Sequence, residues 1–595
     1  MVGSTGARNA ADVIDQWDKY RTTMAVVRET LLEFRSSCPE LQDLAGACGL
    51  SPSREPPSAQ AIAQLRLLVA KAVGLGANKV KKHHAASTWR YNLVRRIMEM
   101  ADDPDLYVAK WLETGFPVGI AKPITPSGLL PAVEETRDIT AEQLEDLAPW
   151  TNNHASFDVP EGDELPAHAL LKDLLDQGFA FLFDSVAEAE SWLDASVVVS
   201  PLGDVTKVKS DGSIKHRLIM DLRASEVNRA SVVQERQVLP RFGDQARDVA
   251  MMSELGKGIG IFILDFKNAF MSLPLAQEEM RFNVSVCPTG LERSRDALYG
   301  GEPRRGSVLV WRVLGFGGHS NPLTYSRAAT FAARSGQALL CAPLSGDMTW
   351  APGRLQLYVD DPALTLSGSI AEQNLSVDLL VAWWLCLGIP LSWDKGGLVC
   401  GDVPHDWIGV SFWSRQKGTC TMRVPKKFAD ELLDLAKQFA HPTTSLVSVA
   451  TAHALCGKAG RLAQVVPEVR PFTTALFTAL AVSLAAAKKG VREAPPNKVA
   501  VRRFRQAATW LVALLGGSPF AVEHTLYLDR QLVCTKERHI EFDASPWGAG
   551  ALLVENEEVV EFFTVVWTSD SARQVGAVPG EARWQTFWEF ATPRS

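Results

Sequence analysis

The feature that most constrains this chain is a pair of adjacent acids, Asp360 and Asp361, inside an otherwise apolar stretch that runs from Leu355 to Leu366. Apolar runs on both sides of a short polar segment predict two strands joined by a tight turn, with the carboxylates at its tip. Neighbouring carboxylates repel one another, and burying them is costly unless a cation is present. Mg²⁺ binds one or two carboxylates together with substrate phosphates, so the pair suits a magnesium site. Taken alone, the stretch fits an ordinary polar hairpin turn equally well, because Asp favours turns.

A second acid strengthens the metal interpretation. Asp265 ends an apolar, strand-like run that begins at Gly260, and a helix-like segment follows it. One acid at a strand end and an acid pair on a hairpin can together hold two metal ions about 3.5–4 Å apart, the arrangement used for phosphoryl transfer. We therefore expect Asp265, Asp360 and Asp361 to converge on a shared Mg²⁺ site.

These acids also carry a resemblance to a known family. Tyr358-Val-Asp-Asp361 resembles the Y-x-D-D box of reverse transcriptases, and Asp265 with Ala269-Phe270 resembles their D-x-x-x-A-F/Y motif. Further segments resemble the family's other motifs in the family's order: Lys215–Arg223 followed by Asn228 (K-x-R-x-x-x-D-x-R, then N), Leu314–Pro322 (L-P-x-G-x-x-x-x-P), Gly388–Lys395 (a segment ending in Lys) and Trp407–Gly409 (the primer-grip turn). The ordered match covers roughly residues 195–415, so it is far more specific than any single motif.

The resemblance implies roles for individual residues. Asp265, Asp360 and Asp361 would be catalytic and would hold Mg²⁺. Arg217, together with Lys209 or Lys207, would neutralise the incoming triphosphate, which suits the bidentate fork of an arginine. Phe270 would lie under the sugar and exclude a 2′-hydroxyl, so the substrate would be a dNTP. Gly317 would let the backbone approach the template and the nucleotide. The alternatives are ordinary packing for Phe270 and an ordinary turn for Gly317.

Two positions depart from the family pattern. Gly315 stands where the family usually has Pro, which loosens that loop. Pro362 directly follows the acid pair, where it removes a backbone donor and biases Asp361 toward extended geometry. If Pro362 distorted the hairpin, activity would suffer.

The length of 595 residues exceeds what one hydrophobic core supports, so several domains are expected. Alternating helical and strand-like segments predict an α+β fold. The resemblance implies a right-hand polymerase with fingers, palm and thumb. The expected units are a helical accessory region (1–114), an extended connection and helical lead-in (115–194), fingers and palm (195–425), a helical thumb or connection (426–525) and a truncated ribonuclease H-like domain (526–595).

The last of these units rests on a second resemblance. His539–Val554 contains a strand, the acid Asp543 and a glycine turn into another strand, and it resembles the opening of a ribonuclease H fold. Gln585–Ala591 resembles the following helix with its acid, Glu589. That fold needs further carboxylates downstream, so we expect about half of the domain and no ribonuclease H activity.

The charge and composition limit where nucleic acid can bind. The net charge is −7, so any positive surface must be local. One basic run, Lys79–Arg96, is either a phosphate-contacting face with stacking aromatics or a solvated helix face whose aromatics pack inward. A second set of basic residues either contacts a nucleic-acid duplex from a helical thumb or only keeps the surface soluble: Lys458, Arg461, Arg502, Arg503 and Arg505.

Composition also bears on location. The nine cysteines form no C-x-x-C pair, which favours a reducing compartment, and the N-terminus lacks the apolar core of a secretory signal. The apolar stretch Thr473–Ala487 is interrupted by Thr and Ser, and it predicts a buried helix instead of a membrane span. We expect an intracellular protein, in the cytoplasm, the nucleus or both, with no membrane partner.

Together, the resemblances imply the RNA-directed DNA polymerase of a retrotransposon, of the long-terminal-repeat or DIRS-type group. Its expected cofactor is a pair of Mg²⁺ ions, with Mn²⁺ as a substitute. Its expected partners are an RNA or DNA template with a primer, a dNTP and other proteins encoded by the element. The alternative is a catalytically inactive remnant that still binds nucleic acid. An RNA-dependent RNA polymerase is disfavoured by Phe270 and by the ribonuclease H-like segment.

Overall fold

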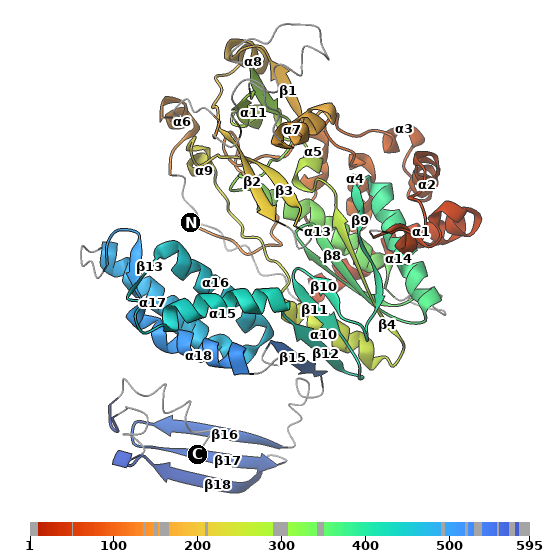
Figure 1. Ribbon diagram of the computed structural model, residues 1–595. Helices are drawn as coiled ribbons and strands as arrows, with labels where there is room; N and C mark the ends of the chain where they lie inside the picture. Colours follow the sequence, from red (N-terminus) through yellow and green to blue (C-terminus); the bar gives the residue numbers. More distant parts are fainter. Residues whose placement is uncertain are drawn as a thin grey trace.

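The computed structural model combines helices with antiparallel sheets, which confirms the α+β expectation (Figure 1). It describes residues 10–49, 51–134, 138–147, 153, 154, 157, 166–208, 212–288, 307–341, 350–488, 494–517, 522–528, 538–555, 558–570 and 578–581.

Helices occupy most of the N-terminal part and the segment after the central sheet. The α-helices are α1 (Ala10–Ser37), α2 (Ala59–Ala72), α3 (Ala77–Val80), α4 (Tyr91–Met100), α5 (Tyr107–Thr114), α6 (Ala141–Leu147), α7 (Pro166–Asp176), α8 (Val186–Leu193), α9 (Val227–Ala230), α10 (Phe242–Glu254), α11 (Gln277–Met280), α13 (Asn321–Leu339), α14 (Ile370–Leu387), α15 (Lys426–Ala440), α16 (Val449–Val465), α17 (Arg470–Lys488) and α18 (Arg505–Gly517). Short 3₁₀ turns are η1 (Pro39–Leu41), η2 (Leu44–Ala47), η3 (Phe270–Ser272), η4 (Pro467–Val469) and η5 (Val501–Arg503).

The strands form several separate sheets. They are β1 (Ala180–Phe183), β2 (Leu202–Val208), β3 (Ile214–Met220), β4 (Ile259–Phe266), β5 (Val284–Val286), β6 (Val308–Trp311), β7 (Gly353–Tyr358), β8 (Asp361–Ser367), β9 (Leu391–Cys400), β10 (His405–Trp407), β11 (Val410–Trp413), β12 (Thr419–Arg423), β13 (Leu446–Ser448), β14 (Lys498–Ala500), β15 (Glu523–Tyr527), β16 (Arg538–Ser545), β17 (Gly548–Glu555) and β18 (Glu558–Val566). The strand orders are β1-β6-β5, β2-β3, β7-β8-β4-β9, β10-β11-β12-β15, β13-β14 and β16-β17-β18.

The central sheet β7-β8-β4-β9 separates two hydrophobic cores. Phe262, Leu264 and Phe266 of β4 belong to a core shared with α13 and α14, whereas Ile261 and Ile263 face a second core that includes α10 and the helices after residue 425. Successive side chains of a strand point to opposite faces, so β4 serves both cores with alternate residues. This explains why its sequence is a nearly continuous apolar run.

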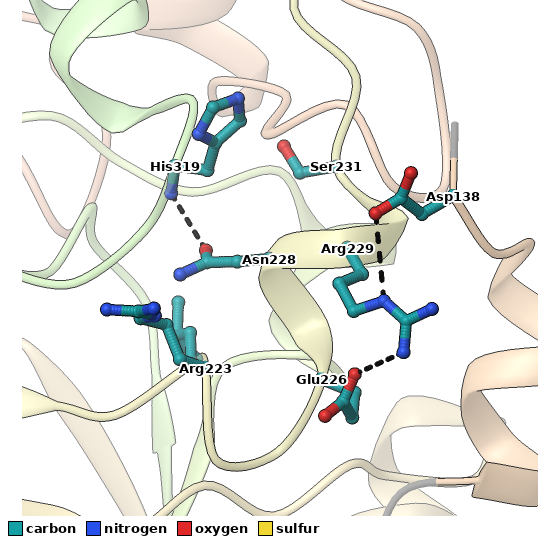
Figure 2. Close-up of a pocket in the computed structure, with 8 residues that line it drawn as sticks. Asp138, Arg223, Glu226, Asn228, Arg229, Ser231 and His319 are labelled. Atoms are coloured by element: carbon teal, nitrogen blue, oxygen red, sulfur yellow. Dashed lines mark hydrogen bonds and ion pairs between the residues drawn. The ribbon is translucent and has the colours of Figure 1, made fainter. Parts of the chain in front are cut away.

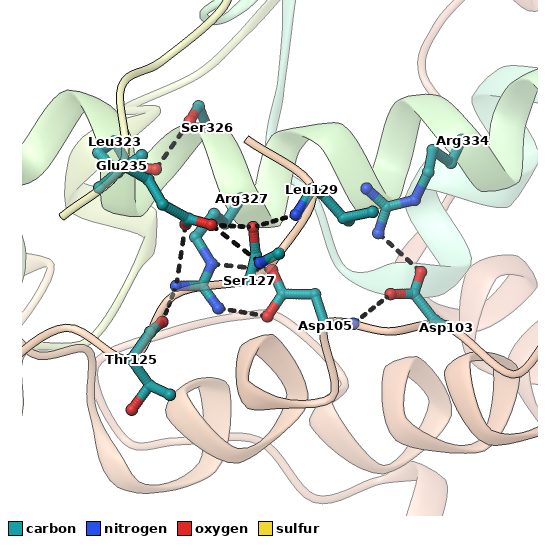
Figure 3. A network of polar contacts seen from close by, with 11 residues as sticks. Asp103, Asp105, Thr125, Ser127, Leu129, Glu235, Leu323, Ser326, Arg327 and Arg334 are labelled. Carbon is teal, nitrogen blue, oxygen red and sulfur yellow. Dashed lines mark hydrogen bonds and ion pairs between the residues drawn. The ribbon is translucent and has the colours of Figure 1, made fainter. Parts of the chain in front are cut away.

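The N-terminal helices belong to the first core instead of forming a unit apart. Side chains of α1, α2 and α4 pack in the same cluster as α13 and α14, so this core crosses the expected boundaries at residues 114 and 194. Buried ion pairs join the same parts of the chain: Arg327 and Arg334 of α13 bind Asp105 and Asp103, as Figure 3 shows. The expected domain limits stay predictions.

The second core holds the helices α15 to α18. Leu476, Ala479 and Leu480 of α17 are buried, but Phe477 and Val482 on the same helix are exposed. The segment Pro467–Ala486 is long and apolar enough to cross a membrane by length and composition alone, a test that core helices of soluble proteins also pass, and most of it is not buried. The sequence-based prediction of a buried helix is therefore correct for one face only.

Candidate active site

The acid pair lies on the turn of a two-strand hairpin, as the sequence predicts. β7 and β8 pair from Gly353 with Leu366 to Tyr358 with Asp361, which leaves Val359 and Asp360 as a two-residue turn. Val359 has φ +59°, a conformation that type II′ hairpin turns require at this position and that glycine usually supplies. A β-branched residue held there stores about 1–3 kcal/mol of strain, and such strain clusters at functional sites.

Pro362 does not distort this hairpin. It pairs with Leu357, and the register of β7 and β8 continues through it without a bulge. The departure from the family pattern at this position therefore leaves the geometry of the turn intact.

Asp265 lies beside the hairpin across the strand pair β4 and β8. The paired part of β4 and β8 ends at Ile263 opposite Ala363, and the backbone N–H of Phe266 donates to the carbonyl of Asp360 at 3.0 Å. Continuing that register places Asp265 opposite Asp361, and directly opposed residues have Cβ atoms about 4.5–5.5 Å apart. Asp265 and Asp361 alternate along their strands with residues of the first core, so both lie on the sheet face that α13 and α14 do not cover.

The acid pair is electrostatically unfavourable as it stands. Burial and the neighbouring charge of Asp360 together raise the pKa of Asp361 to about 6, against the opposing effect of Lys215. Burial likewise raises the pKa of Asp360, and the cations Arg217 and Lys215 lower it in part. The site thus carries negative charge that a cation would stabilise.

Lys395 supplies a cation to the third acid. Its ammonium forms an ion pair with the carboxylate of Asp265. Within the described residues, no group of three or more His, Cys, Asp or Glu side chains gathers closely enough to hold a metal ion. The backbone therefore brings the three acids side by side, and their convergence on one Mg²⁺ site stays a prediction.

An aromatic group forms one wall of the site. Phe270, half-buried in η3, lies 5.5 Å from the ring of Phe316 and 5.0 Å from that of Tyr325, measured between centroids. The guanidinium of Arg217 lies 5.7 Å from the centroid of Phe316. Burial and the charges of Asp360 and Asp361 raise the pKa of Tyr325 well above its usual range.

Gly317 occupies a position that only glycine tolerates. Its φ is +119°, and a Cβ there would collide with the carbonyl of Met220 on β3. Asn228 holds the same loop, because its Nδ2 donates to Gly317 O at 2.9 Å and its Oδ1 accepts from His319 N at 2.8 Å. The loop is thereby fixed against the β2-β3 hairpin that carries Arg217.

A polar cavity of about 420 Å³ opens beside this loop. Figure 2 shows Asn228, His319 and Arg223 on one side of it and Arg229 on the other, bound to Glu226 at 2.7 Å. Polar and charged groups of both signs therefore line the cavity.

The turn after β10 connects the hairpin to the helices beyond residue 425. Trp407 Nε1 donates to Asp361 O at 3.0 Å, and its ring meets that of Tyr358 edge-on at 6.5 Å. The next residues, Ile408 and Gly409, both have positive φ. Arg461 of α16 donates from Nη2 to Ile408 O, so it holds this turn and does not extend freely toward a ligand.

Other sequence-predicted residues lie away from the acids or outside the described part of the chain. Lys209 and Glu589 lie outside the described residues. Asp543 is exposed on β16, in the three-stranded sheet at the C-terminal end. Trp89 and Tyr91 in the basic run are buried, and Arg95 pairs with Glu113, which favours the solvated-face interpretation of that run.

The sequence analysis assigned no role to three residues around the candidate site. Lys215 and Tyr325 interact electrostatically with the acid pair, and Phe316 contacts Phe270. Lys215 begins the segment that also holds Arg217, and β alternation would have placed the two side chains on one face. Tyr325 follows Pro322 by three residues, so the helix period would have placed it one turn into α13.

Comparisons with known proteins give a structural likeness only. No family model matches the chain, and no curated protein matches it. Similar solved structures are the foamy viral protease-reverse transcriptase dRH with double-stranded DNA (16% identity, TM-score 0.42, 80% of this chain), the foamy viral protease-reverse transcriptase with double-stranded DNA (16%, 0.41, 80%) and the same protein with an RNA/DNA hybrid (14%, 0.41, 80%). This chain spans 65%, 78% and 50% of those chains, respectively. Because these scores are low, we base the functional proposal on the acids and their surroundings.

Proposed function

We propose that this chain is an RNA-directed DNA polymerase that adds dNTPs to the 3′-hydroxyl of a primer. The observation that carries the proposal is the position of Asp265 beside the strained Val359–Asp360 turn, on the face of the central sheet that α13 and α14 do not cover. Three acids from two distant segments lie side by side there along the backbone, in an order and spacing that resemble the reverse transcriptase motifs. In this proposal, the central sheet is the palm, the β2-β3 hairpin belongs to the fingers and α15 to α18 form the thumb.

The residues around the acids suit a nucleotide. Arg217 and Lys215 are exposed on β3 and lie close enough to lower the pKa of Asp360, so they would bind the triphosphate. Phe270, supported by Phe316 and Tyr325, would contact the sugar. The polar cavity beside Gly317 would receive the template strand.

Asp265, Asp360 and Asp361 would hold two Mg²⁺ ions, since hard carboxylate oxygens are the ligands that Mg²⁺ prefers. When bound, the ions would stabilise the charge that develops on the transferred phosphoryl group. The elevated pKa values of the acid pair fit a cation at this position, and Asp265 must exchange Lys395 for the metal. Mn²⁺, with similar ligand preferences, would substitute.

Primer extension tests the proposal. The wild-type chain should extend oligo(dT) on poly(rA) with dTTP and Mg²⁺, and Asp360→Asn should reduce the rate at least about 100-fold, a change of about 2.7 kcal/mol. Asp402→Asn, an exposed acid after β9, is the matched control and should extend normally. Wild-type protein that binds the primer–template but never extends it would contradict the proposal.

One observation favours a second candidate, a catalytically inactive protein that binds nucleic acid. Lys395 already neutralises Asp265, so a chain in which this ion pair persists could not use all three acids. Binding without extension at any Mg²⁺ or Mn²⁺ concentration would support it. A retrotransposon origin, partners encoded by the same element, and a location in the cytoplasm or nucleus belong to the polymerase proposal.

A further inference from the structure

A segment of the N-terminal region reaches the turn that carries Phe270. Ser87 Oγ donates to Ser272 O at 2.6 Å, and Trp89 Nε1 donates to Ser272 Oγ at 3.3 Å. Ser272 Oγ in turn donates to Ala269 O at 2.7 Å. We use the name strap for the four residues Ser87, Thr88, Trp89 and Arg90. Through Ser272, the strap begins a hydrogen-bond relay that ends at Ala269, one residue before Phe270.

The strap is fixed at a second point next to the same site. Thr88 Oγ1 donates to Gly388 O at 2.6 Å, and Arg90 N donates to Leu387 O at 2.8 Å. Gly388 has φ +84°, and a Cβ there would collide with Thr88 O. The chain after Gly388 continues into β9, which carries Lys395, so the strap bridges the two segments that flank Asp265.

The turn with Phe270 has few backbone hydrogen bonds of its own. It is one short 3₁₀ turn, η3, in which Ser272 N donates to Asn268 O at 2.8 Å and to Ala269 O at 3.2 Å, and Leu273 N donates to Phe270 O at 3.1 Å. Isolated 3₁₀ turns have poor hydrogen-bond geometry and little stability of their own. Trp89 and Ser272 are both buried, so their hydrogen bond is shielded from competition with water.

We propose that Trp89 and Ser272 are positioning residues for sugar selection: their relay holds the η3 turn so that the ring of Phe270 stays where a 2′-hydroxyl would lie. The inference rests on the proposed polymerase function and adds, in Trp89, a determinant from outside the segment that resembles reverse transcriptases. A ring excludes a hydroxyl only while its position is fixed, because a shift of a fraction of an ångström relieves the overlap. Loosening η3 should therefore admit ribonucleotides.

Single-nucleotide incorporation tests the inference, with dCTP and rCTP measured on one template. Trp89→Phe keeps an aromatic side chain and removes the indole N–H donor. Ser272→Ala removes a single oxygen, the hydroxyl that relays the contact to Ala269. Each should lower the ratio of the dCTP to the rCTP incorporation efficiency about three- to tenfold. The change should come from a faster rCTP reaction, which a general loss of stability would not produce.

Trp383→Phe is the matched control. Trp383 is equally buried, and its Nε1 donates to a serine, Ser335 Oγ, at 2.9 Å, but that bond joins α14 to α13 instead of reaching η3. In Trp383→Phe, the ratio of the dCTP to the rCTP incorporation efficiency should equal that of the wild type. Wild-type protein without extension would refute the proposed function, whereas extension with an unchanged ratio in both Trp89→Phe and Ser272→Ala would refute only this inference. An equal fall in Trp383→Phe would also refute it.

Discussion

Asp361 shows how much charge the site holds without a cation. Its pKa is about 6 in the folded chain against an ordinary value of 3.8, because it is buried beside Asp360. Between these values the folded state binds more protons than the unfolded state, so the free energy of unfolding falls as pH rises through this window and stays low above it.

Replacing Asp361 should remove that pH dependence. In metal-free buffer, Asp361→Asn should raise the free energy of unfolding by roughly 1 kcal/mol at pH 8, after allowance for solvent screening, and by little at pH 4. Urea unfolding with EDTA at both pH values measures this, and Asp543→Asn, an exposed acid on β16, is the control. An equal gain in the free energy of unfolding at both pH values would show that burial of the Asp361 charge does not cause the stabilisation.

Phe270 gives a second test at the scale of single residues. Phe270→Val should remove most of the ring that rests on Phe316 and Tyr325 and raise rNTP incorporation about 10–100-fold, because overlap in a packed site costs roughly 1–3 kcal/mol. dNTP incorporation should fall only modestly. If the wild type used rNTPs as readily as dNTPs, Phe270 would be an ordinary packing residue.

At the scale of elements, α16 is joined to the acid-bearing hairpin through the turn after β10. Arg461 holds Ile408 O, and the adjacent Trp407 holds Asp361 O. Arg461→Ala should release this turn, because a hydrogen bond from a charged group contributes about 1.5–3 kcal/mol. We expect the KM for primer–template to rise about tenfold while the KM for dNTP stays unchanged.

Arg505→Ala is the control for that change. Its Nη2 donates to Thr444 O at 2.7 Å, a bond of the same kind among the same helices but away from the turn. Steady-state kinetics with varied primer–template should leave this variant near the wild type. An equal effect in both variants would mean that Arg461 acts only through the stability of the helices.

Elements also show what the sequence could predict. The hairpin, the strand ending at Asp265 and the helix after Leu314–Pro322 follow from apolar patterning and local turn preferences, which depend on near neighbours. The inward packing of Trp89 and Tyr91 and the ion pair between Lys395 and Asp265 depend on contacts between residues far apart in the chain, so no local pattern could indicate them.

At the scale of the whole molecule, buried ion pairs tie the N-terminal region to α13. Arg327 and Asp105 are 222 positions apart and almost fully buried. Removing one partner of a buried pair leaves an uncompensated charge and costs about 3–5 kcal/mol. Asp105→Ala should therefore lower the melting temperature by many degrees and abolish extension at 37 °C.

An exposed ion pair provides the comparison. Glu278→Ala removes the partner of Lys122, an exposed pair that should contribute less than about 1 kcal/mol. Thermal unfolding of both variants measures the difference. If the melting temperature of Asp105→Ala equalled that of Glu278→Ala, the N-terminal region would not depend on the ion pair between Asp105 and Arg327.

The alternation of β4 between two cores has a consequence for how this sequence can change over time. Ile261, Ile263 and Asp265 share one face, and Phe262, Leu264 and Phe266 share the other. Inserting or deleting one codon between Ile261 and Asp265 would turn the carboxylate into the core beneath α14. A deletion would put Phe266 where the acid should be, and an insertion would put Leu264 there. This strand can therefore gain or lose only an even number of residues, whereas the loops at its ends can change length by any number.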